Sequence, residues 1–525
     1  MPPFKKTEIH SSIFPGVGAG DGEDEADATS TAFPSKANSF DGQRGNEKEK
    51  IILVTFDDND PEDPFNWPTS KKWMMTVLLC SMTMMIGLST TAYSSGINKM
   101  AAELGFSVEA GQAGLTAFNG ACAVLPLFIA PLCELTGRRW IYLGGFAGFT
   151  FITFGLAFAQ NLATIIICRL LSGSFGSIGT ILVGGTLSDM WKPEDISVPM
   201  SLFTFAAIFS TIFAPTYSGY IDQYLGWRWI QYIHLAASGI VLLLEVITLR
   251  ESRGEAILRS RAKRLRRETG QKNLRAKAEL EGDTIGQLFR HSSLRAIKLF
   301  ASEPVVVFLG LWIALAWGTT FLFLSVISIT FADIRGWSEG NAGLPYLSLA
   351  LGCFFTFGAG LLQDKAYDRN KAKNGHGSPE ARLYIAMAGG SMLPVGLMIY
   401  SWTGPFVWVH WFGPMVGLFL IIVGIYSIFL SVYSYTADAY PAIASSAIAA
   451  QGLMRNMLAA VTPLFASQMF NGMGVQWAGL LLSLVALALT PLPFVLFLKG
   501  KTIRQKSKNA ASDKDLEQEE KHGQA

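Results

Sequence analysis

The sequence predicts an all-α membrane protein with twelve transmembrane helices in two pseudo-symmetric halves of six. Three observations favour this fold class: few charged residues, twelve long apolar segments, and a weak internal repeat. Only 16% of the 525 residues are charged and 50% are hydrophobic, with a mean hydropathy of +0.33. A soluble chain usually carries close to a quarter charged residues. The composition therefore excludes an ordinary soluble domain.

Twelve apolar segments are long enough to cross a bilayer, because about 20 helical residues span its ~30 Å hydrocarbon core. The first six are 72–94, 112–133, 140–159, 161–187, 198–221 and 229–249. The second six are 304–330, 342–363, 381–402, 409–435, 446–470 and 475–498. A charged connector separates the two sets.

The remaining parts of the chain are polar. An acidic run with little hydrophobic pattern predicts a disordered cytoplasmic tail at the N-terminus, and the C-terminus has a similar composition. Apolar residues on one side of 284–300 predict an amphipathic helix on the inner membrane surface. The predicted domains are a tail over 1–70, a half over 71–250, a basic connector over 251–302, a second half over 303–499 and a tail over 500–525.

The distribution of Lys and Arg predicts the orientation in the membrane. Basic residues gather in the 136–140 turn, the connector, residues 363–373 and the C-terminal tail, whereas the alternate loops carry few. Cytoplasmic loops of membrane proteins carry the excess of Lys and Arg. Both termini are therefore expected in the cytoplasm, which agrees with an even number of spans.

The two sets of six segments share an internal repeat. The stretch APTYSGYIDQYLGWRW at 214–229 resembles TPLFASQMFNGMGVQW at 462–477. The matching residues are Pro215 with Pro463, Gly226 with Gly474 and Trp229 with Trp477. A weaker match sets Glu134 over Asp364 and Arg139 over Arg369. Membrane proteins built from two parallel repeats bind small solutes between the halves, near the midplane.

Arg169 lies deep inside an apolar segment, about eight residues or roughly 12 Å from its end. A charge at such depth usually faces a cavity or the bundle interior, which favours a place beside a substrate or proton pathway. Two structural alternatives stay open, namely snorkelling to the outer interface and pairing with backbone carbonyls. Glycines follow at 173, 176 and 179. These small residues predict that a neighbouring helix approaches closely.

Arg455 lies well inside the eleventh segment and has no acidic neighbour in the sequence. We expect it on the same pathway, with Trp317, Phe321 and Tyr346 as candidate lining residues. An unpaired cation is costly in a low dielectric, so a pathway for polyamines needs carboxylates at mid-membrane depth. The acidic residues of the predicted spans lie at cytoplasmic ends or close to one: Glu134, Asp364, Asp438 and Glu245. The pattern favours an organic acid or a neutral, oxygen-rich amphiphile.

A cluster of charged residues follows the second segment directly. It comprises Glu134, Gly137, Arg138 and Arg139. Guanidinium groups form bidentate pairs with carboxylates, so this cluster predicts a latch across an inner gate, with a plain basic turn as the alternative. In the second half, Asp364, Arg369 and Asp438 are the candidates for the same gating role.

Two prolines lie inside predicted helices. Pro215 with Gly219 in the fifth segment and Pro463 in the eleventh segment predict helix bends, although proline is also tolerated in ordinary membrane helices.

GWSEG at 336–340 fits the G-x-S-x-G pattern of hydrolases, but that motif needs a strand before it and a helix after it. Between two membrane spans it is predicted to be a turn.

The sequence contains no metal-ligand spacing, nucleotide-binding loop or basic aromatic surface for nucleic acid. All five cysteines lie in apolar segments, which does not favour a disulfide framework. We therefore expect no metal, no cofactor, no nucleic-acid partner and no catalytic residue. The chain is not expected to be an enzyme.

Several motifs resemble the major facilitator superfamily. APLCELTGRRWIYL at 130–143 resembles its loop 2–3 signature, RLLSGSFGS at 169–177 its span-four arginine motif, and APTYSGYI at 214–221 its span-five antiporter motif. In that last motif Ala214 and Ser218 replace glycines. DPFNWP at 63–68, GWSEGNAGLPYL at 336–347 and YTADAYPAIASSAIAA at 435–450 are similar to the fungal twelve-span drug:H⁺ antiporter branch.

This resemblance implies a proton-coupled secondary transporter that exports a small organic solute by alternating access. It gives Arg169 a role in proton coupling or substrate contact, Glu134, Arg138 and Arg139 the gating latch, and Pro215 with Gly219 the antiporter bend. The expected cargo is an itaconate-like organic acid, or a secreted secondary metabolite or glycolipid. The alternatives are a multidrug, toxin or polyamine exporter of the same fold, and a membrane-embedded acyltransferase or hydrolase. The expected partners are the substrate, protons and membrane lipids, for a monomer in the plasma membrane.

Overall fold

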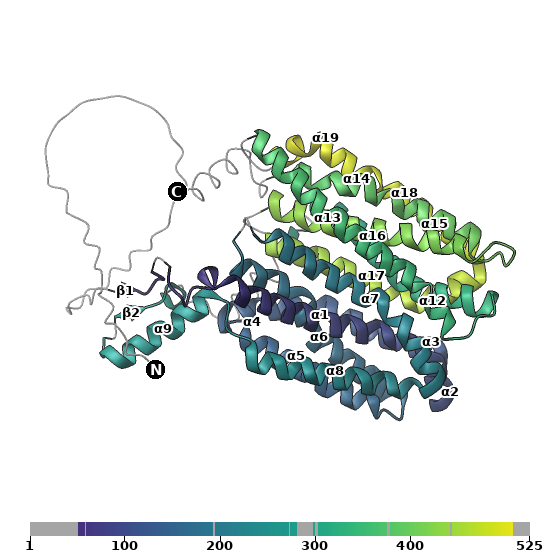
Figure 1. Ribbon diagram of the computed structural model, residues 1–525, viewed down its shortest axis with the longest axis horizontal. Helices are drawn as coiled ribbons and strands as arrows, with labels where there is room; N and C mark the ends of the chain where they lie inside the picture. Colours follow the sequence, from purple (N-terminus) through teal and green to yellow (C-terminus); the bar gives the residue numbers. More distant parts are fainter. Residues whose placement is uncertain are drawn as a thin grey trace. The chain divides into compact units, whose positions relative to one another are not determined.

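The computed structural model describes residues 51–507, except 58, 193–194, 272, 281–297, 300–302, 375–377 and 441–443. Eleven helical segments within these residues are long and apolar enough to cross a membrane. The remaining predicted span, 446–470, coincides with α17 (Ala444–Met473), a longer and more polar helix. The described chain is therefore an all-α bundle of twelve spans (Figure 1).

The first half contains eight helices in chain order. They are α1 (Thr69–Ser95), α2 (Ile97–Leu104), α3 (Val108–Val124), α4 (Pro126–Thr136), α5 (Arg139–Ala157), α6 (Leu162–Met190), α7 (Ser197–Leu225) and α8 (Trp227–Thr248). The second predicted span comprises α3 and α4, because Pro126 has no N–H to donate and begins a new helix.

The second half repeats this pattern. Its longer elements are α12 (Pro304–Ser328), α13 (Tyr346–Asn374), α14 (Tyr384–Gly390), α15 (Met392–Thr403), α16 (Phe412–Ala439), α17, α18 (Val475–Leu489) and α19 (Pro491–Lys506). Short helical turns are η2 (Ile329–Ile334), η3 (Asn341–Gly343) and η4 (Pro379–Leu383). The structure forms a turn at GWSEG, where η3 follows irregular residues.

The internal repeat has a structural counterpart. Pro215 lies inside α7 and Pro463 inside α17. Gly226 and Gly474 end these two helices with φ of 91° and 81°, a backbone conformation that glycine adopts without steric cost. The same residue types therefore form the same corner in each half.

Helices of the first half pack closely at the glycines after Arg169. A Cβ atom at Gly173 would overlap the carbonyl oxygen of Phe118 in α3, and one at Gly179 would lie 2.5 Å from Ile86 in α1. The predicted close approach of neighbouring helices is confirmed here.

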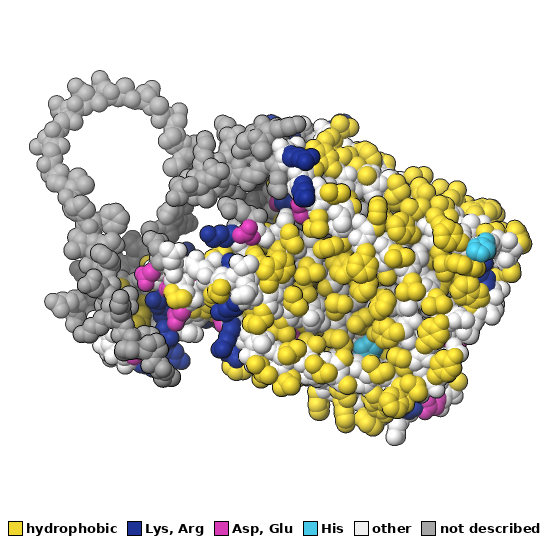
Figure 2. All heavy atoms as spheres, in the orientation of Figure 1, with side chains coloured by type: hydrophobic (Ala, Val, Ile, Leu, Met, Phe, Trp, Pro, Cys, Tyr) yellow, Lys and Arg dark blue, Asp and Glu magenta, His cyan; other side chains and the backbone are white. Residues whose placement is uncertain are grey.

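The bundle has two distinct ends. We call the end that carries the 136–139 turn and the connector the connector end, and the end that carries residues 95–108 and 335–345 the loop end. Lys and Arg gather at the connector end, whereas hydrophobic side chains cover the helices between the ends (Figure 2). The five cysteines are buried and free.

Part of the connector folds against the residues that precede α1. Strand β1 (Ile52–Leu53) pairs in parallel with β2 (Leu274–Arg275), beside α9 (Gly254–Thr269) and α10 (Lys277–Leu280). Asp60 forms an ion pair with Arg261 of α9, and the short helix η1 (Pro64–Asn66) leads to α1. Part of the tail predicted over 1–70 is therefore folded, because acidic residues after position 50 bind connector arginines. The amphipathic helix predicted over 284–300 lies almost entirely outside the described residues.

Candidate functional site

Arg169 of α6 is completely buried inside the first half. Its Nη1 and Nη2 donate to the carbonyl oxygens of Ser89 at 3.3 Å and Thr90 at 3.0 Å, both in α1. Its Nε donates to the Gly114 carbonyl oxygen of α3 at 3.3 Å. One guanidinium group thereby connects three helices.

Two aromatic rings complete the surroundings of Arg169. The ring centroids of Tyr93 and Phe118 lie 4.4 Å and 4.7 Å from the guanidinium carbon. Among the described residues, Arg169 forms no ion pair with a carboxylate. Carbonyl dipoles and aromatic faces compensate the cost of burying this charge. Pairing with backbone carbonyls was one of the two structural alternatives that the sequence left open. Its role in proton coupling or substrate contact stays a prediction.

Arg455 of α17 has a different environment, at the contact between the two halves. Its Nη1 donates to the Tyr433 hydroxyl at 2.7 Å, and its Nε donates to Asn456 Oδ1 at 3.2 Å. Asn456 in turn donates to the Cys122 carbonyl oxygen of α3, in the other half, at 3.1 Å. Arg455 is 9% exposed, and no carboxylate among the described residues pairs with it.

Aromatic side chains surround the Arg455 guanidinium group. The ring centroids of Trp317 and Phe429 both lie 5.4 Å from its guanidinium carbon. Trp317 also contacts Phe321 and Phe429, with ring centroids 5.7 Å and 5.1 Å apart. The structure therefore brings together three of the predicted pathway residues, Arg455, Trp317 and Phe321. We call this group with Phe429 and Tyr433 the Arg455 cluster.

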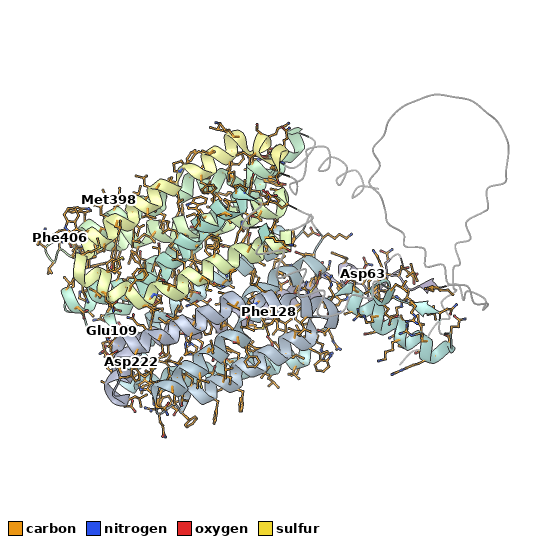
Figure 3. The ribbon with its side chains drawn as sticks, turned by 180° about the vertical axis from the view of Figure 1, so that it is seen from behind. Asp63, Glu109, Phe128, Asp222, Met398 and Phe406 are labelled. Carbon is orange, nitrogen blue, oxygen red and sulfur yellow. The ribbon has the colours of Figure 1, made fainter. Side chains whose placement is uncertain are left out.

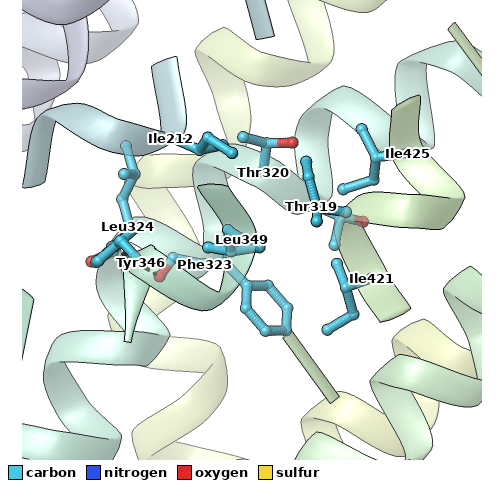
Figure 4. A pocket seen from close by; sticks show the side chains of 10 residues that line it. Ile212, Thr319, Thr320, Phe323, Leu324, Tyr346, Leu349, Ile421 and Ile425 are labelled. Atoms are coloured by element: carbon cyan, nitrogen blue, oxygen red, sulfur yellow. Dashed lines mark hydrogen bonds between the residues drawn. The ribbon is translucent and has the colours of Figure 1, made fainter. Parts of the chain in front are cut away.

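No ring contact or hydrogen bond joins Tyr346 to the Arg455 cluster among the described residues. It lines a small apolar cavity (Figure 4). Its hydroxyl donates to the carbonyl oxygens of Phe323 and Leu324 at 3.3 Å each. The cavity belongs to the second half except for Ile212 of α7. The other lining residues are Thr319, Thr320, Phe323, Leu324, Leu349, Ile421, Ile422 and Ile425.

Several polar contacts join the two halves at the loop end. The Tyr220 hydroxyl of α7 donates to Asn341 Oδ1, and the Gly340 amide donates to Gln223 Oε1, each at 2.8 Å. A Cβ atom at Gly219 would lie 2.9 Å from the Glu339 carbonyl oxygen. Gly219, predicted only as a bend residue, therefore lies where the second half touches α7.

An ion-pair cluster lies beside these hydrogen bonds. Lys99 Nζ of α2 lies 3.2 Å from Glu339 Oε2 and 3.5 Å from Asp222 Oδ2 of α7. Between residues that the structure describes, Lys99–Glu339 is the ion pair that joins the two halves. We call Lys99, Asp222 and Glu339 the loop-end latch.

A second acidic residue supports the loop end within the first half. Glu103 of α2 accepts a hydrogen bond from Trp227 Nε1 at 2.7 Å and pairs with Arg228. The bonds from Arg228 and Trp227 hold the pKa of the Glu103 carboxyl below its ordinary value.

At the connector end, charged residues pair within each half. Arg138 Nε lies 2.5 Å from Asp189 Oδ2, at the end of α6. The backbone amides of Arg138 and Arg139 donate to the Glu251 carboxylate at 2.9 Å and 3.0 Å. Gly137 adopts φ of 90°, which allows the chain to turn over that carboxylate.

The second half has a matching arrangement around Arg382. Its Nε donates to Asp438 Oδ2 at 2.9 Å, and its Nη1 to Asp364 Oδ1 at 3.3 Å. Arg369 is exposed, and the side chain of Glu134 lies outside the described part. The ion pairs of Arg138 and Arg382 given above each lie within one half, and the gating role of the predicted residues stays a prediction.

Sequence reasoning missed several residues that the structure brings together. Asp189 and Arg382 were not selected because their partners are distant in sequence. Lys99 of α2 and Glu339 lie in segments between the predicted spans, where the total charge indicates orientation but not which residues pair. Asp222 was overlooked inside the repeat, where Phe470 occupies the equivalent position. Comparing the positions at which the two repeats differ would have identified Asp222.

Two six-helix halves that meet around the buried Arg455 are the architecture of multi-pass membrane transporters for small molecules. A sequence model described as Major Facilitator Superfamily matches residues 77–463. The chain belongs to this superfamily.

Proteins with curated descriptions include close relatives in fungi. The chain is 32% identical over 462 residues to the transporter paaT of Penicillium rubens, covering 88% of this chain and 84% of the relative. It is 31% identical over 472 residues to the multidrug transporter mdrA of Aspergillus fumigatus, covering 88% and 77%. It is 32% identical over 457 residues to the ascochitine biosynthesis cluster transporter of Didymella fabae, covering 86% and 87%. The chain is thus similar to fungal transporters of this superfamily.

A solved structure has the same fold. It is a mutant of the peptide transporter POT in complex with alafosfalin, with a TM-score of 0.57 and 15% sequence identity. The match covers 84% of this chain and 99% of the solved chain.

Proposed function

We propose that this protein is a proton-coupled exporter of an organic acid or an oxygen-rich amphiphilic metabolite, located in the plasma membrane with both termini in the cytoplasm. The basic residues at the connector end support this orientation, because Lys and Arg mark cytoplasmic loops (Figure 2). Relatives named as a multidrug transporter and as a biosynthesis-cluster transporter support an export role.

The contacts between the halves support an alternating-access mechanism. The loop end is held across the halves by Lys99–Glu339, Tyr220–Asn341 and Gln223–Gly340. At the connector end, the described ion pairs of the bundle stay within one half. With the connector end in the cytoplasm, this is a conformer closed to the outside. Rocking of the halves then exposes the Arg455 cluster to each side in turn.

The Arg455 cluster is the single observation that supports an organic acid or an oxygen-rich amphiphile as the substrate. Arg455 is a buried cation, and no described carboxylate pairs with it. A carboxylate or ester oxygen on the cargo offers the missing acceptor, and a guanidinium group binds such oxygens strongly. The rings of Trp317, Phe321 and Phe429 supply an apolar surface for the rest of the molecule.

The positions of the acidic residues argue against a polycationic cargo. Asp222 belongs to the latch at the loop end, and Glu245 is buried one turn from the connector end of α8. Neither residue is part of the Arg455 cluster. A polyamine bound there would place two or more positive charges beside Arg455, and like charges repel strongly in a low dielectric.

The test is flux measurement in proteoliposomes with an imposed pH gradient. We expect small carboxylic acids or glycolipid-like esters to move, faster when the gradient is present, and spermidine neither to move nor to compete. Arg455→Gln should lower the flux at low substrate by about ten- to hundred-fold, since a hydrogen bond to a charged group contributes about 1.5–3 kcal/mol.

The matched control is Arg267→Gln, because Arg267 is an exposed arginine on α9. It should transport at the wild-type rate. Saturable spermidine flux, or normal anion flux by Arg455→Gln, would contradict the substrate class. Flux that ignores the imposed gradient would contradict proton coupling.

A further inference from the structure

Asp222 is a buried acidic residue at the loop end whose carboxylate has few partners. Its side chain is 1% exposed, and neither carboxylate oxygen accepts a hydrogen bond from a described residue. The nearest cation is Lys99, with Nζ 3.5 Å from Oδ2. Figure 3 shows Asp222 at the end of the bundle opposite Asp63, which precedes α1 near the connector.

Lys99 does not serve Asp222 alone. It also pairs with Glu339 of the second half and donates to the Asp222 carbonyl oxygen. One ammonium group therefore divides its interactions between a buried carboxylate and a half-exposed one, whose side chain is 48% accessible. The buried carboxylate lies directly beneath the contact that closes the two halves.

The internal repeat indicates that packing does not require an acid at this position. Phe470 occupies the equivalent place in α17 and is 2% exposed. An apolar side chain thus suits the same helix corner in the second half. A buried carboxylate is costly, and its presence in only one half favours a role that the carboxyl group itself performs.

Other charged groups near Asp222 are already engaged. On α8, Arg228 pairs with Glu103, and His234 is bonded to the Tyr217 hydroxyl and the Ile230 carbonyl. On α3, Glu109 is exposed, and no ion pair joins it to Asp222 or Lys99 among the described residues. Lys99 and Glu339 are therefore the charges that act on Asp222 in the closed state.

We propose that Asp222 is a proton-binding residue that couples closure of the loop end to pH. When the halves part at this end, water reaches the carboxylate and solvates its charge. When they close, the charge loses that water, and Lys99, which belongs to the same half as Asp222, is shared with Glu339. The neutral form therefore fits the closed state better than the open one. By linkage, a group that binds its proton more tightly in the closed state makes acid favour closure.

This response has a direct consequence for export. An acidic medium at the loop end protonates Asp222 after the cargo has left, and the protein returns to the conformer that is open at the connector end. The place of this step in transport rests on the proposed function, whereas the pH response of the latch does not.

The experiment measures the distance across the loop end. Spin labels are attached at Tyr224→Cys and Trp408→Cys, which are 74% and 81% exposed, lie outside the latch and belong to different halves. The five native cysteines are buried, so labelling is selective. Distances between the labels are recorded in lipid nanodiscs between about pH 5 and 8, where one coupled proton changes the ratio of closed to open protein by up to about tenfold per pH unit.

In the wild type, the short distance should gain population as the pH falls. Asp222→Asn, which is always neutral, should remove this dependence and keep the short distance at every pH. Asp222→Glu retains a titratable group and should retain the dependence. Glu339→Gln is the matched control, and it should lower the closed fraction while keeping its response to pH.

An unchanged pH response in Asp222→Asn, or its loss only in Glu339→Gln, would overturn the proposal. A wild-type distance that does not change with pH would overturn it as well. A distance that responds to pH, together with a flux in liposomes that does not depend on the pH gradient, is a separate outcome. That result would contradict proton-coupled transport, but it would leave the assignment of Asp222 as a proton-binding residue intact.

Discussion

Replacing Arg169 with alanine tests whether this buried cation holds the first half together. The substitution removes three hydrogen bonds to backbone carbonyls in α1 and α3 and leaves a cavity between Tyr93 and Phe118. Truncating a large buried side chain costs about 2–5 kcal/mol. Relief from the desolvation of a buried charge offsets part of this loss, so we expect a net cost of about 2–3 kcal/mol.

The assay uses the native cysteines as reporters of unfolding. Cys122 and Cys168 are buried beside this site, so a thiol-reactive dye labels them only when the first half opens. A loss of 2–3 kcal/mol corresponds to a fall in Tm of about 4–12 °C for a unit of this size. Transport in proteoliposomes should be lost, because the guanidinium group sets the relative positions of three helices.

Two further variants separate geometry from charge. Arg169→Lys keeps the charge but lacks the planar fork that reaches three carbonyl oxygens at once, so it should also be destabilised and transport poorly. Arg267→Ala, at an exposed position on α9, should change stability by no more than about 0.5 kcal/mol. The reasoning is refuted if Arg169→Ala melts with the wild type and transports at the wild-type rate.

Three other perturbations follow from the loop end. Single cysteines introduced in residues 95–111 and 331–341 should react with an impermeant reagent on intact cells, and reaction only after permeabilisation would reverse the orientation. Gly219→Ala should weaken closure and slow transport, because its Cβ atom would lie 2.9 Å from the Glu339 carbonyl oxygen. The control is Gly120→Ala, whose Cβ atom would meet nothing within 4 Å. It should behave as wild type in the spin-label and flux assays. The pKa of Glu103 is lower in the folded protein than its ordinary value of 4.5. The ionised Glu103 therefore stabilises the folded state fully at pH values above 4.5. This stabilisation is lost as the pH falls through the pKa of the folded state. Glu103→Gln should therefore unfold with a weaker dependence on pH below 4.5, as measured by the dye assay, and an identical acid profile would exclude this contribution.

The helices were predictable because apolar length and glycine or proline punctuation are local signals. The first segment was expected over 72–94 and α1 runs over Thr69–Ser95, while Gly226 and Gly474 mark equivalent corners in the two halves. The contact between the segment before α1 and the connector was not predictable in this way. Asp60 and Arg261 lie far apart in the chain, and their charges alone do not identify them as partners.

The candidate site was predictable only in part, for the same reason. Arg455, Trp317 and Phe321 were selected by depth and residue type, and they meet in the structure. Tyr346 was selected on the same grounds but lines a separate cavity. Depth restricts where a side chain lies along the membrane normal, but it does not determine which way that side chain points around the helix.

The distribution of polar contacts suits a protein that moves as two rigid halves. Arg138–Asp189 and Arg382–Asp438 tie helix ends together inside each half, so they stay formed while the halves rotate. The contacts that must break lie at the loop end. There, two hydrogen bonds contribute about 0.5–1.5 kcal/mol each, and the half-exposed Lys99–Glu339 pair at most about 1 kcal/mol. These contacts add to the hydrogen bonds Asn456–Cys122 and Gln112–Ser467 and to the helix packing between the halves. Cargo or proton binding acts on this balance, because each tenfold difference in affinity between two states shifts it by about 1.4 kcal/mol.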